Sequence, residues 1–464
     1  MLFTQDILRP FEAQAFKRPM TYRRILTRDV FVANSPEHVR DAFVTQHEAF
    51  QRKTPQMRSA LAPLVGDGLF VSDGDLWKKR RLAIAPIVHT RHMRSFYPIM
   101  LEAALEWREH WAKEVDSGPV DILNEMGLLT AEIIARSVFG QRVGRKYTND
   151  IVTNFARYQK YVGQTAIADM VHLPNWVPRF QRPEVGKSAG RIHTIIDQIM
   201  DEIIRDREAD AASGITSEEQ QRCPRHAMIS QLFDAQEDGK PAFDREAIRN
   251  EAMILFMAGH ETTANTLAWV FYLLSQAEWA RDKLDEEHRQ VLGGRAPTYE
   301  DLGKLVYTRA VIEETLRLYP PVPLLGREAV CPGKLGDREV SEGSIVLVAP
   351  WLLHRNPNLW DRPDDFIPER FLGEKRPGKY QYVPFSIGPR VCPGMQFALN
   401  EAITCLAVLR QAFDLRLVPG TRVHPSTRLT LRPGETLPMT VHVNANAMAP
   451  TPAGEAPVAE AAHT

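Results

Sequence analysis

One long segment, which runs from Asp244 to about Gln276, restricts the possible fold more than any other part of the sequence. It reads DREAIRNEAMILFMAGHETTANTLAWVFYLLSQ, and its middle is apolar on nearly every face of a helix. Such a helix is stable only when other elements surround it, so the segment predicts a central helix buried inside a large protein. A chain of 464 residues is long enough to bury such a helix in a sizeable core.

The rest of the sequence predicts a helical bundle with β-rich segments at both ends. From about 76 to 290, apolar residues recur mostly three and four positions apart, as in LEAALEWREHWAKEV, which is typical of amphipathic helices. Near the start, TYRRIL and DVFVAN alternate and carry β-branched residues. Past Pro320, short runs such as SIVLVAP lie between prolines and glycines. We therefore expect a mainly α protein with a smaller β part.

Composition excludes several classes of protein. Lys plus Arg number 57 against 58 for Asp plus Glu, so no excess of positive charge favours nucleic acid or anionic lipid. The four cysteines include no CxxC pair and are too few for a disulfide framework, which indicates a reducing compartment. Charged residues and Pro10 interrupt the N-terminal segment, so we expect no membrane anchor and no signal peptide. These features predict a cytoplasmic protein.

The segment PFSIGPRVCPG carries the most specific chemical signal of the chain. It places Phe385, Gly388, Arg390, Cys392 and Gly394 in the pattern FxxGxRxCxG, ahead of the helical run MQFALNEAITCLAVL. A loop that opens onto a helix N-terminus directs backbone N–H groups at a thiolate, and we expect these donors and the helix dipole to lower the pKa of the Cys392 thiol. The alternative is an ordinary small buried thiol, which is our interpretation of the other three cysteines.

This pattern resembles the haem-binding loop of the cytochromes P450, and further motifs of that family follow in the expected order along nearly the whole chain. The resemblance implies that Cys392 is the proximal ligand of the iron of haem b. It also implies that Phe385, Gly388, Arg390 and Gly394 belong to the cofactor-binding loop. An anionic sulfur on the iron favours cleavage of the O–O bond of dioxygen, which a neutral histidine ligand does less well.

The resemblance also implies a fold and its boundaries. We expect the cytochrome P450 fold, a triangular helix bundle around a buried haem with a β-rich lobe, in a chain that acts as a monomer. Residues 1–445 are expected to form a single catalytic domain, and the low-complexity residues 446–464 a disordered tail. Within the domain, the β-rich part covers about 20–50 and 325–350, the helical bundle about 76–320 and the haem loop 384–394.

Glu314 and Arg317 lie three residues apart in TRAVIEETLRLYP, on one face of a helix. By themselves, such pairs usually lie on a solvated surface. In the cytochromes P450 this ExxR pair is buried and is joined by an arginine of a segment found here as PERF, with Arg370. The resemblance therefore implies a structural network of Glu314, Arg317 and Arg370 that holds the haem loop, and the removal of one buried partner should be costly.

The segment AGHETT, from Ala258 to Thr263, matches the oxygen-binding pattern of the same family. A glycine and an acid cost stability in an apolar helix, so they require a reason. The resemblance implies that the helix distorts around Gly259 to form a groove for oxygen, with Thr262 hydrogen-bonded to bound dioxygen and Glu261 supplying protons. The alternative is that the Thr262 hydroxyl bonds back to its own helix and that Glu261 is an exposed residue.

Cationic residues elsewhere match the family's ligands for the carboxylates of haem. Trp77 and Arg81 share one helix face in the pattern WxxxR, and Arg327 lies in PVPLLGREA, where relatives carry such an arginine. We expect these residues and Arg390 to bind the haem carboxylates, with which guanidinium groups pair bidentately. The alternative for Trp77 and Arg81 is a basic solvated face. The neighbouring cations, which are expected to form a docking patch for an acidic electron donor, are Lys78, Lys79 and Arg80.

Residues at analogous positions are expected to line the substrate pocket. Ala258 is expected against the cofactor, and Phe256, Val322 and Leu324 near the iron, with AIADMVHLPNWV as part of an access lid. These apolar side chains predict an apolar small-molecule substrate, such as a fatty acid, a terpenoid, a steroid or an aromatic compound.

The leading hypothesis is a haem-dependent monooxygenase that inserts one atom of O2 into an apolar substrate by hydroxylation or epoxidation. No flavin or iron–sulfur region follows the haem loop, so electrons from NAD(P)H are expected to arrive through a separate ferredoxin or flavodoxin-type donor and its reductase. A haem-thiolate peroxygenase or isomerase is one alternative, and it would not need Glu261 and Thr262. A non-catalytic haem sensor or carrier is another, and it would need a signalling domain or a partner surface.

Overall fold

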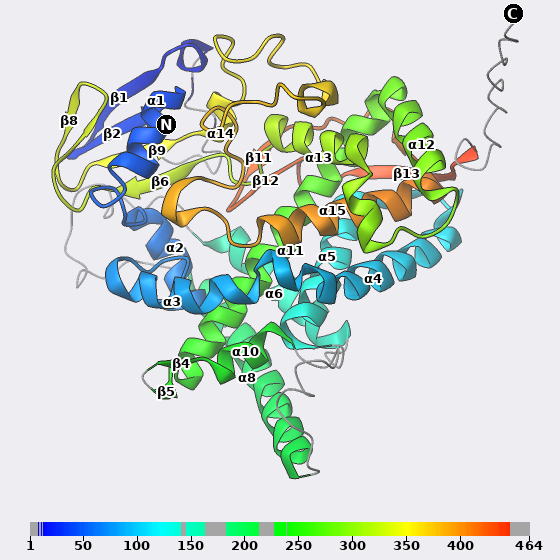
Figure 1. The fold of residues 1–464 in the computed structure, drawn as a ribbon, viewed down its shortest axis with the longest axis horizontal. Coiled ribbons are helices and arrows are strands. Elements are labelled where there is room, and N and C mark those ends of the chain that lie inside the picture. Colours follow the sequence, from blue (N-terminus) through cyan, green and yellow to red (C-terminus); the bar gives the residue numbers. More distant parts are fainter. Residues whose placement is uncertain are drawn as a thin grey trace, which may run out of the picture.

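The computed structural model describes residues 13–140, 145–162, 182–212, 227–237 and 239–445, together with Leu8 and Phe11. Helices make up most of the body, and a β-rich lobe lies at one side of them (Figure 1). The predicted mainly α class is therefore confirmed. The predicted tail at 446–464 and the predicted lid segment AIADMVHLPNWV lie outside the described residues.

Long helices form the body, and shorter helices and helical turns lie between them and in the β-rich lobe. The longer helices are α2 (Pro55–Val65), α3 (Gly74–Ile87), α4 (Met93–Glu114), α5 (Ile122–Phe139), α6 (Arg145–Tyr161), α8 (Pro183–Ala212), α11 (Arg245–Gln276), α12 (Glu278–Leu292), α13 (Val306–Leu318) and α15 (Met395–Ala412). The shorter ones are η1 (Ala13–Phe16), α1 (Pro36–Arg40), η2 (Asp41–Thr45), η3 (Thr90–His92), α10 (Met228–Asp234), η4 (Tyr299–Gly303), α14 (Pro350–Leu353), η5 (Pro368–Phe371) and η6 (Gly388–Arg390).

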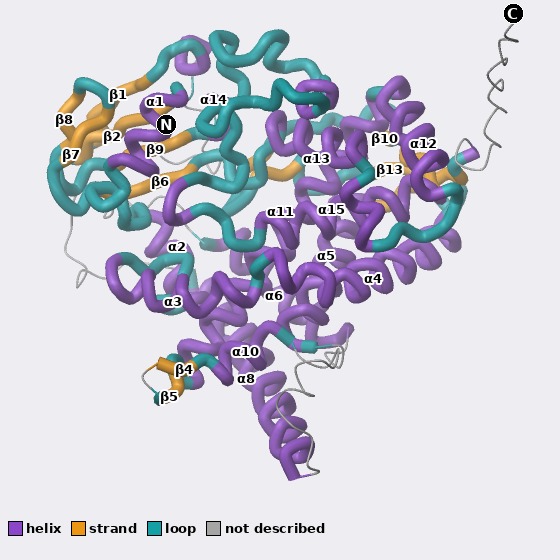
Figure 2. The backbone as a smooth tube through the Cα atoms, in the orientation of Figure 1, coloured by secondary structure: helices purple, strands orange, loops and turns teal. Residues whose placement is uncertain are grey.

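The strands form one larger sheet and several small ones. The lobe contains a four-stranded sheet in the order β1-β2-β9-β6, in which only β2 and β9 pair in parallel. A three-stranded sheet, β10-β13-β3, lies at the far side of the body from this lobe (Figure 2). The strands are β1 (Met20–Ile25), β2 (Arg28–Ala33), β3 (Pro119–Asp121), β6 (Leu325–Glu328), β9 (Ile345–Val348), β10 (Phe413–Leu417) and β13 (Pro438–Val443), with three hairpins, β4–β5 (Gln236–Glu237, Lys240–Pro241), β7–β8 (Gly333–Leu335, Arg338–Val340) and β11–β12 (Ser426–Thr427, Leu431–Arg432).

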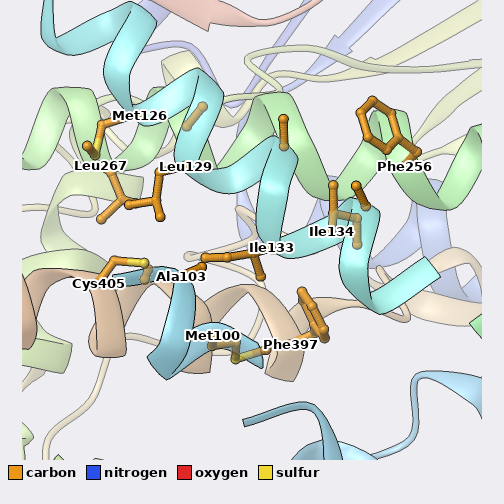
Figure 3. Packing of buried hydrophobic residues seen from close by; sticks show 14 of the residues in the cluster. Met100, Ala103, Met126, Leu129, Ile133, Ile134, Phe256, Leu267, Phe397 and Cys405 are labelled. Carbon is orange, nitrogen blue, oxygen red and sulfur yellow. The ribbon is translucent and has the colours of Figure 1, made fainter. Parts of the chain in front are cut away.

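Helix α11 is the central helix that the sequence predicts. Asp244 caps its first turn, because its carboxylate accepts a hydrogen bond of 2.8 Å from the backbone N–H of Ala247. The helix packs against α5, α13 and α15, so apolar side chains are buried around most of its circumference. Figure 3 shows this core, in which α4, α5, α11 and α15 contribute Met100, Ala103, Met126, Leu129, Ile133, Ile134, Phe256, Leu267, Phe397 and Cys405.

Gly259 lies in the middle of α11, where the sequence predicts a local distortion. Helix α11 runs without interruption from Arg245 to Gln276, so no break in it occurs at Gly259. A side chain at position 259 would place its Cβ atom 2.6 Å from Cδ1 of Ile134, which lies on α5. The glycine is therefore required for the close approach of α5 and α11.

The described part of the chain contains no helix that is both long enough and apolar enough to span a lipid bilayer.

Candidate functional site

The cysteine loop connects the turn η6 to α15, and backbone constraints fix its shape. The N–H of Cys392 donates a hydrogen bond of 2.9 Å to the carbonyl oxygen of Phe385, which closes the loop. Gly388 has a φ of 77°, and a Cβ atom there would lie 2.0 Å from the carbonyl oxygen of Phe43. Only glycine fits this position, so the pattern FxxGxRxCxG has a direct steric reason. Gly394 is the N-cap residue of α15.

The surroundings of Cys392 set the pKa of its thiol. Its side chain is accessible to solvent, yet surrounding protein raises the pKa of its thiol by desolvation. The Gly394 N–H and the nearby Arg81 guanidinium oppose this shift but do not reverse it. The predicted lowering of the thiol pKa is therefore wrong for the polypeptide alone, because desolvation exceeds both stabilising interactions. A coordinating metal ion deprotonates a thiol outright, so the raised pKa of the free thiol does not oppose a role of Cys392 as a metal ligand.

Helix α11 presents an accessible face although other elements surround it. Ala258 is exposed in the middle of this buried helix, and Thr262, one turn further on, is partly exposed. Val322 and Leu324 are also partly exposed. Accessible residues on a central helix require an internal cavity, and together with Cys392 they supply an apolar surface and a sulfur ligand of the kinds that haem needs.

Phe256 does not line this cavity, which corrects the sequence prediction. Its side chain is completely buried, and its ring lies 6.2 Å from the ring of Phe139 and 5.8 Å from the ring of His260, between centroids. Phe256 precedes Ala258 by two residues, which places it on the opposite side of the helix. It is part of the packed core in Figure 3.

Two arginines, of which Arg327 is buried and Arg390 is partly exposed, form no ion pair with a carboxylate among the described residues. Arg327 on β6 is 3% exposed, donates a hydrogen bond to the carbonyl oxygen of Gly326, and lies 4.5 Å from the ring centroid of Phe43. Arg390 donates to the carbonyl oxygen of Ser72. Burial lowers the pKa of Arg327 to about 9 and that of Arg390 to about 10, and the two cations repel each other. Desolvated cations of this kind fit the carboxylates of haem.

Helix α3 places Trp77 and Arg81 beside these groups. The guanidinium of Arg390 lies 4.4 Å from the ring centroid of Trp77, and both residues line one pocket with Arg327. Burial lowers the pKa of Arg81, and the nearby Cys392 sulfur opposes the shift, so Arg81 lies on the sulfur side of the site. Both residues are partly exposed, and Trp77 packs against Arg390 within the pocket.

Arg80 also lies away from the expected docking patch. Its side chain is buried and pairs with Glu251 on α11, at 2.9 Å, and with Asp67. The exposed part of the patch is therefore smaller than predicted, and Lys78 is its most exposed member, with a side chain that is 66% exposed.

Glu314 and Arg317 form a completely buried ion pair on α13, in which Nε and Nη2 of Arg317 each lie 2.8 Å from a carboxylate oxygen of Glu314. Arg317 also donates to the carbonyl oxygens of His354, Pro363 and Asp365, between 2.6 and 2.8 Å. All of these groups are therefore satisfied inside the protein. Figure 1 shows that α13 lies next to α15, which follows the cysteine loop.

The same network includes the PERF segment and reaches the cysteine loop. Arg370 approaches Glu314 at 3.4 Å. His354, which the sequence analysis did not identify, accepts a hydrogen bond of 2.9 Å at Nε2 from the N–H of Val383, two residues before Phe385. Burial lowers the pKa of His354 to about 3, so its ring is neutral and Nε2 is an acceptor. The network thus connects α13 to the start of the cysteine loop.

Glu261 is buried rather than exposed. Its carboxylate pairs at 2.8 Å with Arg432, from hairpin β11–β12, and accepts a hydrogen bond of 2.5 Å from Gln159, on α6. Thr262 donates its hydroxyl to the carbonyl oxygen of Ala258 at 2.7 Å, as the alternative interpretation expected. Arg432 and Gln159 were missed, because they lie 171 and 102 residues from Glu261 and no local pattern marks them.

Comparisons with known proteins agree on one family. A family model described as Cytochrome P450 matches residues 7–438. Cyclooctatin synthase from Streptomyces melanosporofaciens is 31% identical over 420 residues, which cover 89% of this chain and 86% of the relative. Carotene epsilon-monooxygenase, a chloroplastic protein of Arabidopsis thaliana, is 29% identical over 388 residues, which cover 79% and 70%. The solved structure of the cytochrome P450DA heme domain is similar to this chain, with a TM-score of 0.77 and 25% identity. The superposition covers 92% of this chain and 90% of that structure.

Proposed function

The chain belongs to the cytochrome P450 family, and we propose that this haem monooxygenase inserts one atom of O2 into a C–H bond or an alkene of an apolar substrate. The family and the fold are those that the sequence predicts, and they imply haem b as the cofactor. The observation that carries the proposed reaction is the position of Thr262 on the accessible face of α11, next to the buried acid Glu261.

The proposed roles follow from the geometry of the site. Bound haem supplies the redox chemistry that activates dioxygen, and a thiolate ligand favours cleavage of the O–O bond. Cys392 is the proposed iron ligand, and Ala258 presents a small side chain to the cofactor. The unpaired cations Arg327 and Arg390, with Trp77 beside them, are the proposed partners of the haem carboxylates.

Glu261 and Thr262 are the proposed groups for proton delivery. Arg432 and Gln159 hold the Glu261 carboxylate in place, and Thr262 is the next residue of the same helix. A hydroxyl can both accept a proton from one side and donate one to the other, so Thr262 connects this acid to the cavity. A peroxygenase or an isomerase would not need this pair, which is why we favour a monooxygenase.

The proposed substrate is an apolar small molecule, because Ala258, Val322 and Leu324 offer no polar group to it. The name of the carotene relative indicates an apolar substrate for that protein, which is consistent with this proposal. Electrons are proposed to come from NAD(P)H through a separate ferredoxin or flavodoxin-type donor, for which Lys78 offers an exposed cation. The cytoplasmic location, the single domain over 1–445 and the monomeric state remain predictions.

Replacement of Thr262 by alanine should separate NAD(P)H consumption from product formation. We expect haem and substrate to bind normally, while the ratio of product to NAD(P)H consumed falls by about tenfold or more and peroxide accumulates, because a proton donor contributes on the order of 10²–10⁴-fold to such a step. Thr266→Ala is the matched control, since its hydroxyl bonds to the carbonyl oxygen of Thr262 and its side chain is buried. Unchanged coupling in Thr262→Ala would reject the proton-delivery role.

A further inference from the structure

We propose that Lys53 binds a carboxylate inside the cofactor site, as a third cation beside Arg327 and Arg390. This inference rests on the proposed function and deepens it, since it assigns an anionic partner to a residue that no motif marks. The carboxylate belongs either to haem or to the substrate, and the two sources are distinguished below.

Backbone pairing fixes Lys53 next to the strand that carries Arg327. The preceding residue, Arg52, accepts a backbone hydrogen bond of 2.8 Å from Glu328 and forms a β-bridge with it. The following residue, Thr54, packs against Gly326, where an added Cβ atom would lie 2.6 Å from Cγ2 of Thr54. Both flanking residues of Lys53 therefore touch β6, so its Cα position relative to Arg327 is well defined.

The Lys53 side chain lies inside the protein but is not sealed in it. It is partly exposed, its Nζ atom lies 4.4 Å from the ring centroid of Phe70, and surrounding protein and the charges of Arg327 and Arg390 lower the pKa of its ammonium group well below the usual value. Cys392 shows the same combination of an accessible side chain and strong desolvation. This combination is typical of a group that faces an internal cavity.

Three neighbouring arginines are paired with carboxylates, whereas the cations of the cluster are not. Arg52 pairs with Asp73, and Arg28 and Arg58 share Glu328 at 2.9 and 3.2 Å. Within the described ranges, by contrast, no ion pair joins a carboxylate to the three cations of the cluster, which are Lys53, Arg327 and Arg390. Asp73 attracts Arg390 without forming an ion pair with it, and Arg81, on the sulfur side, shares this lack of a paired carboxylate.

Three desolvated positive charges in mutual repulsion are costly unless anions accompany them. Haem brings two carboxylates, so the cluster provides one cation more than a simple one-to-one pairing requires. Lysine acts as a mobile point charge rather than a planar fork, so it can join an arginine on one carboxylate or take a carboxylate of its own. A carboxylate is therefore the ligand that the cluster is built to bind, and an apolar substrate with an acid group is the alternative source to haem.

The test compares Lys53→Gln, which removes the charge, with Lys53→Arg, which keeps it. Lys304→Gln is the control for net charge, because Lys304 is exposed and pairs with Asp301 far along the chain. One measurement is the rate of haem transfer from the ferric holoprotein to excess apomyoglobin. The other is the Soret titration of the holoprotein with dodecanoic acid and with 1-dodecanol, which share a chain and differ in charge. If Lys53→Gln does not accumulate, Lys53→Met replaces it.

Two outcomes support the proposal and identify the source. Haem loss that is faster by about tenfold in Lys53→Gln, and restored in Lys53→Arg, assigns the lysine to a haem carboxylate, as expected for a lost charge-assisted hydrogen bond. A preference for the acid over the alcohol that disappears only in Lys53→Gln, with unchanged haem loss, assigns it to the substrate. Unchanged haem loss and unchanged ligand preference overturn the proposal. Failure of the proposed function is separate, because it appears as unchanged coupling in Thr262→Ala with Lys53 intact.

Discussion

Replacement of Arg317 by alanine is expected to leave little haem-loaded protein and to lower the free energy of unfolding by about 3–5 kcal/mol, the cost of removing one partner of a buried ion pair. The variant would leave the carboxylate of Glu314 buried without its main counter-charge. It would also remove the donors to the carbonyl oxygens of His354, Pro363 and Asp365. Since His354 holds Val383, we expect the cysteine loop to lose its fixed shape.

Urea unfolding of the purified proteins, followed by fluorescence and by the Soret band, measures both effects. Lys283→Ala is the matched control, because its ion pair with Glu369, at 2.6 Å, is largely exposed and should contribute only about 0–1 kcal/mol. Normal haem content and normal stability in Arg317→Ala would mean that the network does not support the cysteine loop.

Replacement of Glu261 by glutamine is expected to slow turnover by about 10²–10⁴-fold with little change in haem content, because the amide keeps the shape of the side chain but cannot carry the proton. The ratio of product to NAD(P)H and the solvent deuterium isotope effect on kcat are the measurements. An unchanged isotope effect and normal coupling would show that protons reach the cavity by another route.

Variants of Arg432 test the same proton route, because Arg432 positions the carboxylate of Glu261. We expect Arg432→Gln to lower turnover and alter the solvent isotope effect, since Glu261 would lose its ion pair at 2.8 Å, and Arg432→Lys to restore both in part. Arg428→Gln is the matched control in the same segment, because Arg428 pairs with the exposed Glu435 instead. A variant at Arg432 that behaves like the one at Arg428 would remove Arg432 from the route.

Local patterns predicted the parts of the site that depend on a short stretch of chain. Gly388 has a positive φ and lies against a neighbouring carbonyl group, so a larger residue does not fit there. The motif that contains Gly388 and Cys392 therefore specifies the shape of the loop by itself. The buried helix α11 could be predicted for a similar reason, since its apolar residues cover nearly every face. Glu314 and Arg317 lie three residues apart on one helix, so their spacing alone places both side chains on one face of that helix.

Long-range partners could not be predicted, because no local pattern specifies them. Lys53, His354 and Arg432 each lie near residues that are distant in the sequence and that only the fold brings to them. Two errors have the same origin. Phe256 was placed by analogy, although the turn of the helix directs it away from Ala258 and into the core. The cationic neighbours of Arg80 predict an exposed side chain, although it reaches Glu251 on another helix.

The absorption spectrum of the dithionite-reduced carbon monoxide complex tests the central claim most directly, because only a thiolate opposite the carbonyl gives the strongly red-shifted Soret band. We expect this band in the wild-type protein and its loss in Cys392→Ser. Cys405→Ser is the control, since Cys405 is buried in the core (Figure 3) and should not affect the band. Haem that binds without the shifted band in the wild type, or a band that persists in Cys392→Ser, would contradict Cys392 as the iron ligand.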